Sequence, residues 1–155
     1  MNMGLTGKSN VKSSLSAKVI RKTGEVIDRG VVSEKMITSV FANLIVDALQ
    51  GQTVGIGTFK YHDTGTGVLA ENVADTALQT PTGLAKATGT QVEGEAANIY
   101  KSVATITYDA NYSITEHGIF NDNNVLMDRS VFEAEMVKSG DKIEWTYLFT
   151  FNAGG

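Results

Sequence analysis

The sequence of 155 residues contains no cysteine, one proline and only two histidines. The missing cysteine excludes disulfide bonds, thiolate metal sites and cysteine nucleophiles. Two histidines, His62 and His117, leave little material for a histidine metal cage, and no apolar run approaches the roughly 20 residues that span a bilayer. The first residues also lack the apolar segment and cleavage site of a signal peptide. We therefore expect one soluble domain that is made in the cytoplasm.

Charge is unevenly distributed along the chain. Residues 1–24 contain five basic side chains and no acidic one, which gives +5. The rest of the chain has 8 basic and 17 acidic residues, which gives −9, and the two parts sum to the net charge of −4. Nucleic-acid binding needs a basic surface. The acidic remainder therefore argues against nucleic acid as a direct partner.

The N-terminal segment differs in composition from the rest of the chain. Residues 1–16 are small, polar and basic, and they bury too little apolar surface to offset the entropy cost of ordering. We therefore predict a flexible basic arm over 1–16 and a single β-rich domain over 17–155. The domain should begin with a hairpin over 17–32, because β-branched runs flank a turn that contains Gly24.

One helix is predicted, over residues 34–50. Apolar residues recur there at the i, i+3, i+4, i+7 spacing of a single buried stripe, with Phe41 near its centre. Ser33 is the expected N-cap, and Gly51 can end the helix in a left-handed conformation. Such a one-sided helix should cover one side of a sheet.

From residue 53 onward the pattern has the period of two that is typical of strands. A strand is predicted over 53–61 and a long Gly- and Thr-rich loop over 62–98. Four further strands are predicted over 99–108, 112–120, 124–135 and 142–152. The fold class is therefore mainly β: an antiparallel β-sandwich or jelly-roll-like domain with one covering helix and an extended N-terminal arm.

The sequence gives no positive signal for enzyme chemistry. Gly7-Lys8-Ser9 lacks the preceding strand and glycine of a phosphate-binding loop, and no serine lies in a Gly-x-Ser-x-Gly elbow. Gly65-Thr66-Gly67 lacks the third glycine of a dinucleotide fingerprint and indicates a loop. His117 is expected to be a packed strand residue and His62 a loop residue. We predict a protein without catalytic residues, metal or cofactor.

One charged pair stands in an otherwise apolar strand. Asp128-Arg129 follows Leu126 and precedes Val131-Phe132. A buried arginine needs carboxylate partners. The candidates are Asp128, Glu116 and Glu133, and the pair is more typical of structure than of catalysis.

Several segments, taken as an ordered series over residues 55–155, carry a resemblance to a known class of proteins. They are Tyr61–Gly67, Ala74–Leu78, Thr88–Glu93, Tyr100–Ile106, Thr115–Phe120, Met127–Phe132, Gly140–Asp141 and Gly154–Gly155. The series resembles small virion structural proteins of tailed bacteriophages, and among these the capsid cement or decoration proteins. The resemblance implies a β-rich, non-enzymatic protein on the capsid surface, often a homotrimer, with the major capsid protein as partner. It implies no catalytic residues, and residues 1–24 lie outside it.

The sequence is also compatible with other functions. The chain resembles a capsid-stabilising protein, but a tail, tail-tip or fibre-associated component would share its properties. A small-ligand or glycan-binding module is a third hypothesis, with the aromatic strand 143–151 as a platform, although such alternation is more typical of a core. The predicted attachment element is the basic N-terminal segment, which would bind an acidic groove on a shell protein or a neighbouring subunit. Its candidate residues are Lys8, Lys12, Lys18, Arg21 and Lys22.

Overall fold

The computed structural model describes residues 10–34, 37–52 and 55–154. Predicted features that fall on residues 1–9, including Lys8, lie outside the described residues. The elements in chain order are β1 (Val11–Ile20), β2 (Val26–Ser33), α1 (Ser39–Leu49), the 3₁₀ turn η1 (Ile56–Thr58), β3 (Tyr61–Gly65), β4 (Ala87–Thr88), β5 (Val92–Glu93), β6 (Ile99–Thr107), β7 (Tyr112–Phe120), β8 (Leu126–Val137) and β9 (Lys142–Phe151).

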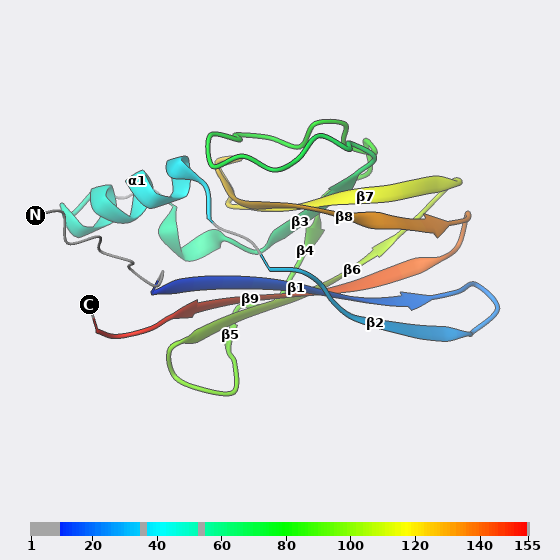
Figure 1. The fold of residues 1–155 in the computed structure, drawn as a ribbon, viewed down its shortest axis with the longest axis horizontal. Helices are drawn as coiled ribbons and strands as arrows, with labels where there is room; N and C mark the ends of the chain where they lie inside the picture. Colours follow the sequence, from blue (N-terminus) through cyan, green and yellow to red (C-terminus); the bar gives the residue numbers. More distant parts are fainter. Residues whose placement is uncertain (1–9, 35–36, 53–54, 155) are drawn as a thin grey trace, which may run out of the picture.

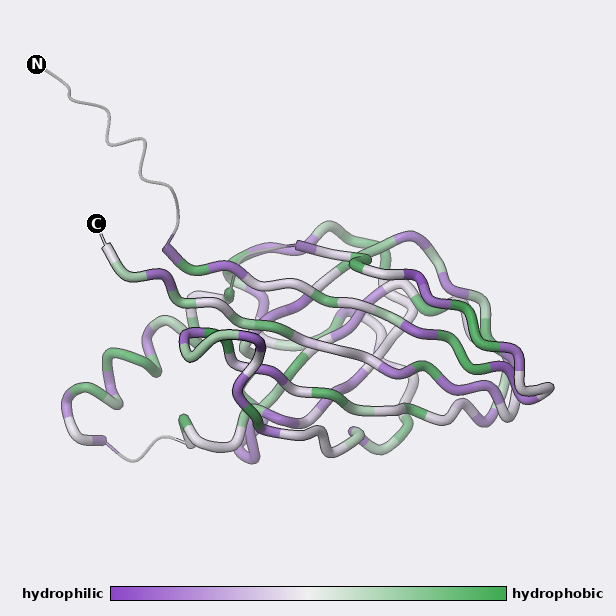
Figure 2. Tube along the Cα trace, turned by 90° about the horizontal axis from the view of Figure 1, so that it is seen from below, coloured by the Kyte–Doolittle hydropathy of each residue, from purple (hydrophilic) through white to green (hydrophobic). Residues whose placement is uncertain are grey.

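The strands form two antiparallel sheets that face one another. The five-stranded sheet has the order β2-β1-β9-β6-β5, and the four-stranded sheet has the order β4-β3-β7-β8. Figure 1 shows the two sheets as layers, with α1 beyond one end of them. In Figure 2 apolar and polar positions alternate along the strands, as half-buried strands require. The predicted β-sandwich with one helix is confirmed for the described residues, but the helix lies at one end of the layers and not over the face of a sheet.

The core lies between the sheets, and β1 and β9 supply much of it. Trp145 and Tyr147 on β9 are 0% and 1% exposed, and their cross-strand partners Ala17 and Leu15 on β1 are also buried. The predicted arm over 1–16 is therefore wrong for residues 11–16. These residues pair with β9 in the middle of a sheet, because Leu15 contributes an apolar side chain to the core and Ser13 faces the same interior.

The helix begins later than predicted. Thr38, and not Ser33, caps α1: its side-chain oxygen accepts a hydrogen bond from the Phe41 N–H at 3.2 Å and donates one to the Leu126 carbonyl at 2.6 Å. Ser33 instead pairs with Leu15 as the last residue of β2. Gly51 adopts a φ of 82° after the helix, as expected. Phe41 is 3% exposed, so α1 closes one end of the sandwich through its buried stripe.

A long loop forms a third layer over the four-stranded sheet. This covering loop, residues 66–86, crosses the outer face of β7 and β8 (Figure 1). Leu78 from the loop packs with Phe120, Leu126 and Tyr61 in a second small apolar cluster. The strand predicted over 53–61 is wrong over 55–60, because Ile56–Thr58 forms η1 and β3 begins only at Tyr61, and its first two residues lie outside the described residues. The four C-terminal strands lie within two residues of their predicted limits.

Candidate functional site

A buried carboxylate on β7 holds the covering loop against the sheet. Glu116 is 0% exposed and accepts four hydrogen bonds. Its donors are the backbone N–H groups of Gly67 at 3.2 Å, Gln79 at 3.0 Å and Thr80 at 2.7 Å, and Arg129 Nε at 2.8 Å. Burial alone raises the pKa of Glu116, but the Thr80 and Gln79 amides and the arginine outweigh it and hold that pKa below its usual value. The carboxylate is therefore charged and joins the start of the loop to Gln79 and Thr80 farther along it.

Arg129 on β8 pairs with Glu116, and we call these two residues the clamp. The arginine side chain is 3% exposed. Besides Glu116, its guanidinium donates to Asp75 Oδ2 at 3.0 Å and to the Leu69 carbonyl at 3.0 Å. The predicted Glu116 partner is confirmed, whereas Glu133 is exposed and Asp128 contacts the opposite sheet. Asp75 was missed, because nothing in the sequence places this loop residue beside β8.

Two glycines make the close approach of loop and clamp possible. A Cβ at Gly65 would overlap the Thr80 carbonyl oxygen and Glu116 Oε1. A Cβ at Gly67 would lie 2.6 Å from the Gln79 side chain and 2.7 Å from Glu116 Oε1. Both positions therefore require glycine for packing, at φ values open to any residue. The Gly-x-Gly spacing in a loop was the one available signal for this contact.

The clamp fixes a loop whose tip presents apolar side chains to solvent. Val68 is 72% exposed, Leu69 64% and Val73 43%. The main chain beside them is held by the Arg129 bond to the Leu69 carbonyl and by the Ser39 N–H bond to the Val73 carbonyl at 2.7 Å. A contact surface that is ordered before binding loses little entropy when a partner docks. Exposed apolar side chains on a main chain fixed in this way are suited to contact with the surface of another protein.

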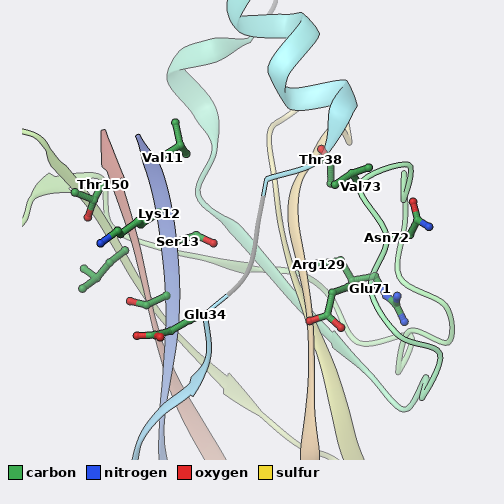
Figure 3. A pocket seen from close by; sticks show the side chains of 12 residues that line it. Val11, Lys12, Ser13, Glu34, Thr38, Glu71, Asn72, Val73, Arg129 and Thr150 are labelled. Carbon is green, nitrogen blue, oxygen red and sulfur yellow. The ribbon is translucent and has the colours of Figure 1, made fainter. Parts of the chain in front are cut away.

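A cleft separates the loop tip from the five-stranded sheet. Its volume is about 640 Å³, which falls within the roughly 300–1,000 Å³ of many ligand sites. In Figure 3, β1 side chains line one wall, covering-loop side chains line the other, and Thr38 marks the start of α1. The lining residues are Val11, Lys12, Ser13, Ser14, Glu34, Thr38, Glu71, Asn72, Val73, Arg129, Leu148 and Thr150.

A second buried carboxylate lies behind this cleft. Asp128 is 2% exposed, and its Oδ2 accepts hydrogen bonds from Ser13 Oγ at 2.5 Å and Tyr147 OH at 3.2 Å. Among the described residues, its Oδ1 has no hydrogen-bond partner. Burial raises the pKa of Asp128 to about 6, against the lowering effect of the two hydroxyl donors. The group is therefore mostly ionised at neutral pH at a cost in free energy.

The two histidines meet in the interior. His62 Nδ1 lies 2.9 Å from His117 Nε2, and His62 Nε2 lies 2.9 Å from Ser102 Oγ. Burial lowers the pKa of His62 to about 4, and burial together with His62 lowers that of His117. The prediction of a packed strand residue is confirmed for His117, whereas His62 lies on β3 and not in a loop. All three residues are fully or almost fully buried, so their chain of hydrogen bonds is a core network.

The predicted attachment residues do not form one patch in the described part of the chain. Lys12 is exposed and lines the cleft, whereas Lys18 lies farther along β1, 4.0 Å from Glu144. Arg21 and Lys22 follow the far end of β1: Arg21 pairs with Asp141 at 3.2 Å, and the Lys22 N–H donates to the same carboxylate at 2.9 Å. Of these four residues, Lys12 alone lies beside the cleft.

Comparisons with family models, curated proteins and solved structures return no match. Within the described residues, no three histidine, aspartate or glutamate side chains gather as a metal would require. Over the same residues, no helix is both long enough and apolar enough to cross a membrane.

Proposed function

We propose that this chain is a non-enzymatic virion structural protein that binds and stabilises an assembled capsid, in the manner of a cement or decoration protein. The observation that carries the proposal is the clamped loop. Segments that resemble such proteins supply Gly65 and Gly67, Asp75, Glu116 and Arg129. The resemblance therefore falls on the residues that hold the loop tip in place, and the exposed Val68, Leu69 and Val73 lie between the resembling segments.

The charged groups of the clamp hold the main chain of the loop in place. The carboxylate of Glu116 is fully buried and has four donors around it, so it positions main chain and does not transfer protons. Three exposed side chains at the loop tip, Val68, Leu69 and Val73, are apolar, and the exposed polar Asn72 lies among them. A decoration protein must recognise many equivalent lattice positions, and a fixed apolar surface on a symmetric oligomer is suited to that task.

The alternative of a glycan-binding aromatic platform loses its main support. Trp145 and Tyr147, the centre of the aromatic strand, are 0% and 1% exposed. Phe151, at the end of this strand, is 57% exposed and lines a shallow hollow with the half-buried Phe149 and Tyr100, so the aromatic surface that remains lies at one end of the strand only. A tail-associated protein would need the same kind of contact surface. Binding to capsids and binding to tails must therefore be compared directly.

Co-sedimentation tests the proposal. Purified protein is mixed with capsids from which decoration proteins have been stripped and, separately, with isolated tails. We expect saturable binding to capsids and a loss of binding for Val68→Asp/Leu69→Asp, since both side chains are exposed and the fold should persist. The matched control is Val26→Asp/Val31→Asp, two exposed valines on β2. Binding to tails alone would support the tail alternative, and binding to neither particle would refute a virion role.

A further inference from the structure

The cleft lies at the end of the molecule where the described chain begins. Val11 and Ser13 of β1 line it. β2 pairs with β1 only as far as Leu15, so the lining residues Val11–Ser14 lie beyond the part of β1 that β2 covers. The chain leaves β2 at Ser33 and crosses to Thr38, whose N–H donates to the Met127 carbonyl at 2.9 Å. The cleft therefore opens between the two sheets where the chain passes from one to the other.

Acidic groups dominate the electrostatics of this cleft. Glu34 and Glu71 line it, and the buried carboxylate of Asp128 lies directly behind Ser13. Of the two cations in the lining, Arg129 is already bonded to Glu116 and Asp75, which leaves Lys12 against the two lining glutamates. Val73 and Leu148 add apolar surface. The complementary occupant is an extended segment with apolar side chains, a positive charge and no acid.

Residues 1–9 of this chain have that composition. Met1, Met3 and Leu5 alternate with small or polar residues, so an extended backbone would place all three on one face. Methionine side chains adapt to irregular cavities. Lys8 is the only charged side chain of the segment, and it is basic. Nine extended residues span about 30 Å, which is enough to reach across an interface.

The geometry at Asn10 favours a neighbouring molecule as the source of this segment. The Asn10 carbonyl accepts a hydrogen bond from the Asn152 N–H at 2.7 Å, and its side chain donates to the Gly154 carbonyl. These bonds tie Asn10 to the chain beyond β9, on the side of β1 opposite to β2. To enter its own cleft, the segment would have to reverse direction at once beside Val11, whereas a second copy can supply it without a turn.

We propose that residues 1–9 of one copy bind in the cleft between β1 and the covering loop of a second copy, so that the chain assembles into oligomers by exchanging arms. The inference goes beyond the capsid proposal and does not depend on it. Of the five predicted attachment residues it assigns only Lys8, and it assigns that residue to a neighbouring subunit, the second of the two partners that the sequence left open.

Two measurements on purified protein test it without any virus particle. Light scattering coupled to size-exclusion chromatography should give an oligomer for the full chain and a monomer after deletion of residues 2–9. A fluorescent peptide of residues 1–10 should bind the truncated protein saturably and more weakly as salt is added. A scrambled peptide, in which the apolar residues no longer alternate, should bind less tightly.

A matched pair of charge reversals locates the binding site on the truncated protein. Glu34→Lys changes an exposed cleft residue, and Glu25→Lys makes the same change at the hairpin beyond β1. We expect Glu34→Lys to weaken peptide binding about fivefold, as one charge pair near a surface allows, and Glu25→Lys to leave it unchanged. Equal oligomer mass with and without residues 2–9, a monomeric full chain, no saturable peptide binding, or equal effects of the two reversals would each overturn the proposal.

Discussion

Replacing Asp128 with asparagine should stabilise the protein more at pH 8 than at pH 4. The wild-type carboxylate is buried, with one oxygen bonded to Ser13 and Tyr147 and the other without a partner among the described residues. Its pKa is about 6 in the folded state, against 3.8 for an aspartate in water. The folded state therefore binds the proton more tightly than the unfolded state, so the contribution of Asp128 to stability is greatest below pH 3.8 and is lost as pH rises through about 6.

The magnitude follows from the two pKa values. A difference of about 2 units corresponds to a penalty of about 3 kcal/mol at pH 8, of which only a small part is present at pH 4. Asparagine has no such penalty at any pH. Any loss from weaker hydrogen bonds to Ser13 and Tyr147 is common to both pH values and cancels in the difference. The stability of the variant relative to wild type should therefore improve by about 2–3 kcal/mol between pH 4 and pH 8, or roughly 5–10 °C in melting temperature.

Urea unfolding of both proteins at the two pH values measures this difference. Asp28→Asn, on the exposed strand β2, is the control, because it makes the same chemical change in contact with water. A relative stability of Asp128→Asn that is the same at pH 4 and pH 8 would refute the argument that Asp128 is ionised and under-partnered in the folded protein.

Two further predictions concern the loop and the histidines. Gly65→Ala should destabilise the protein by about 1–3 kcal/mol and speed hydrogen exchange of the loop amides. Gly57→Ala, with nothing within 4 Å of the new Cβ, should do neither. Equal effects of the two substitutions would contradict the close approach of the loop to Gly65. Folding lowers the pKa of His62 to about 4 and also lowers that of His117, so their contribution to stability is present above pH 6.5 and is lost as pH falls toward 4. In the Asp128→Asn background, urea midpoints should therefore fall over this range, and constant midpoints would show that the histidines are not buried in the neutral form.

The strands were predictable where one face meets the core. On β9, Ile143, Trp145 and Tyr147 alternate with polar residues, and that alternation places the strand and its inner face. Arg129 was predictable in the same way, because an arginine in an apolar strand requires a carboxylate, and Glu116 provides it. Both inferences depend on burial, which leaves a periodic signal in the sequence.

Boundaries and long-range contacts left no comparable signal. The apolar spacing through Ile37 continues the stripe of α1 toward the N-terminus. The helix nevertheless begins only after Thr38, because Thr38 is hydrogen-bonded to the Leu126 and Met127 carbonyls of the sheet. Residues 11–16 were assigned to a flexible arm because most of their side chains are polar. Their place in the sheet is set by pairing with β9, which their own composition does not reveal. The clamp depends largely on backbone N–H groups, which every residue except proline carries, so sequence cannot show where they converge.

Glu116 accepts hydrogen bonds from Gly67 at one end of the loop and Thr80 at the other. One side chain thus ties the loop at two points, and the segment between them is also held to the rest of the domain at Leu69, Val73 and Leu78. Loop-closure entropy grows only slowly with length. A peptide inserted at exposed Ala70 should therefore be displayed without unfolding the domain. Under the proposed function, this segment is the place where substitutions would change the contact with a partner while the sheets remain the same.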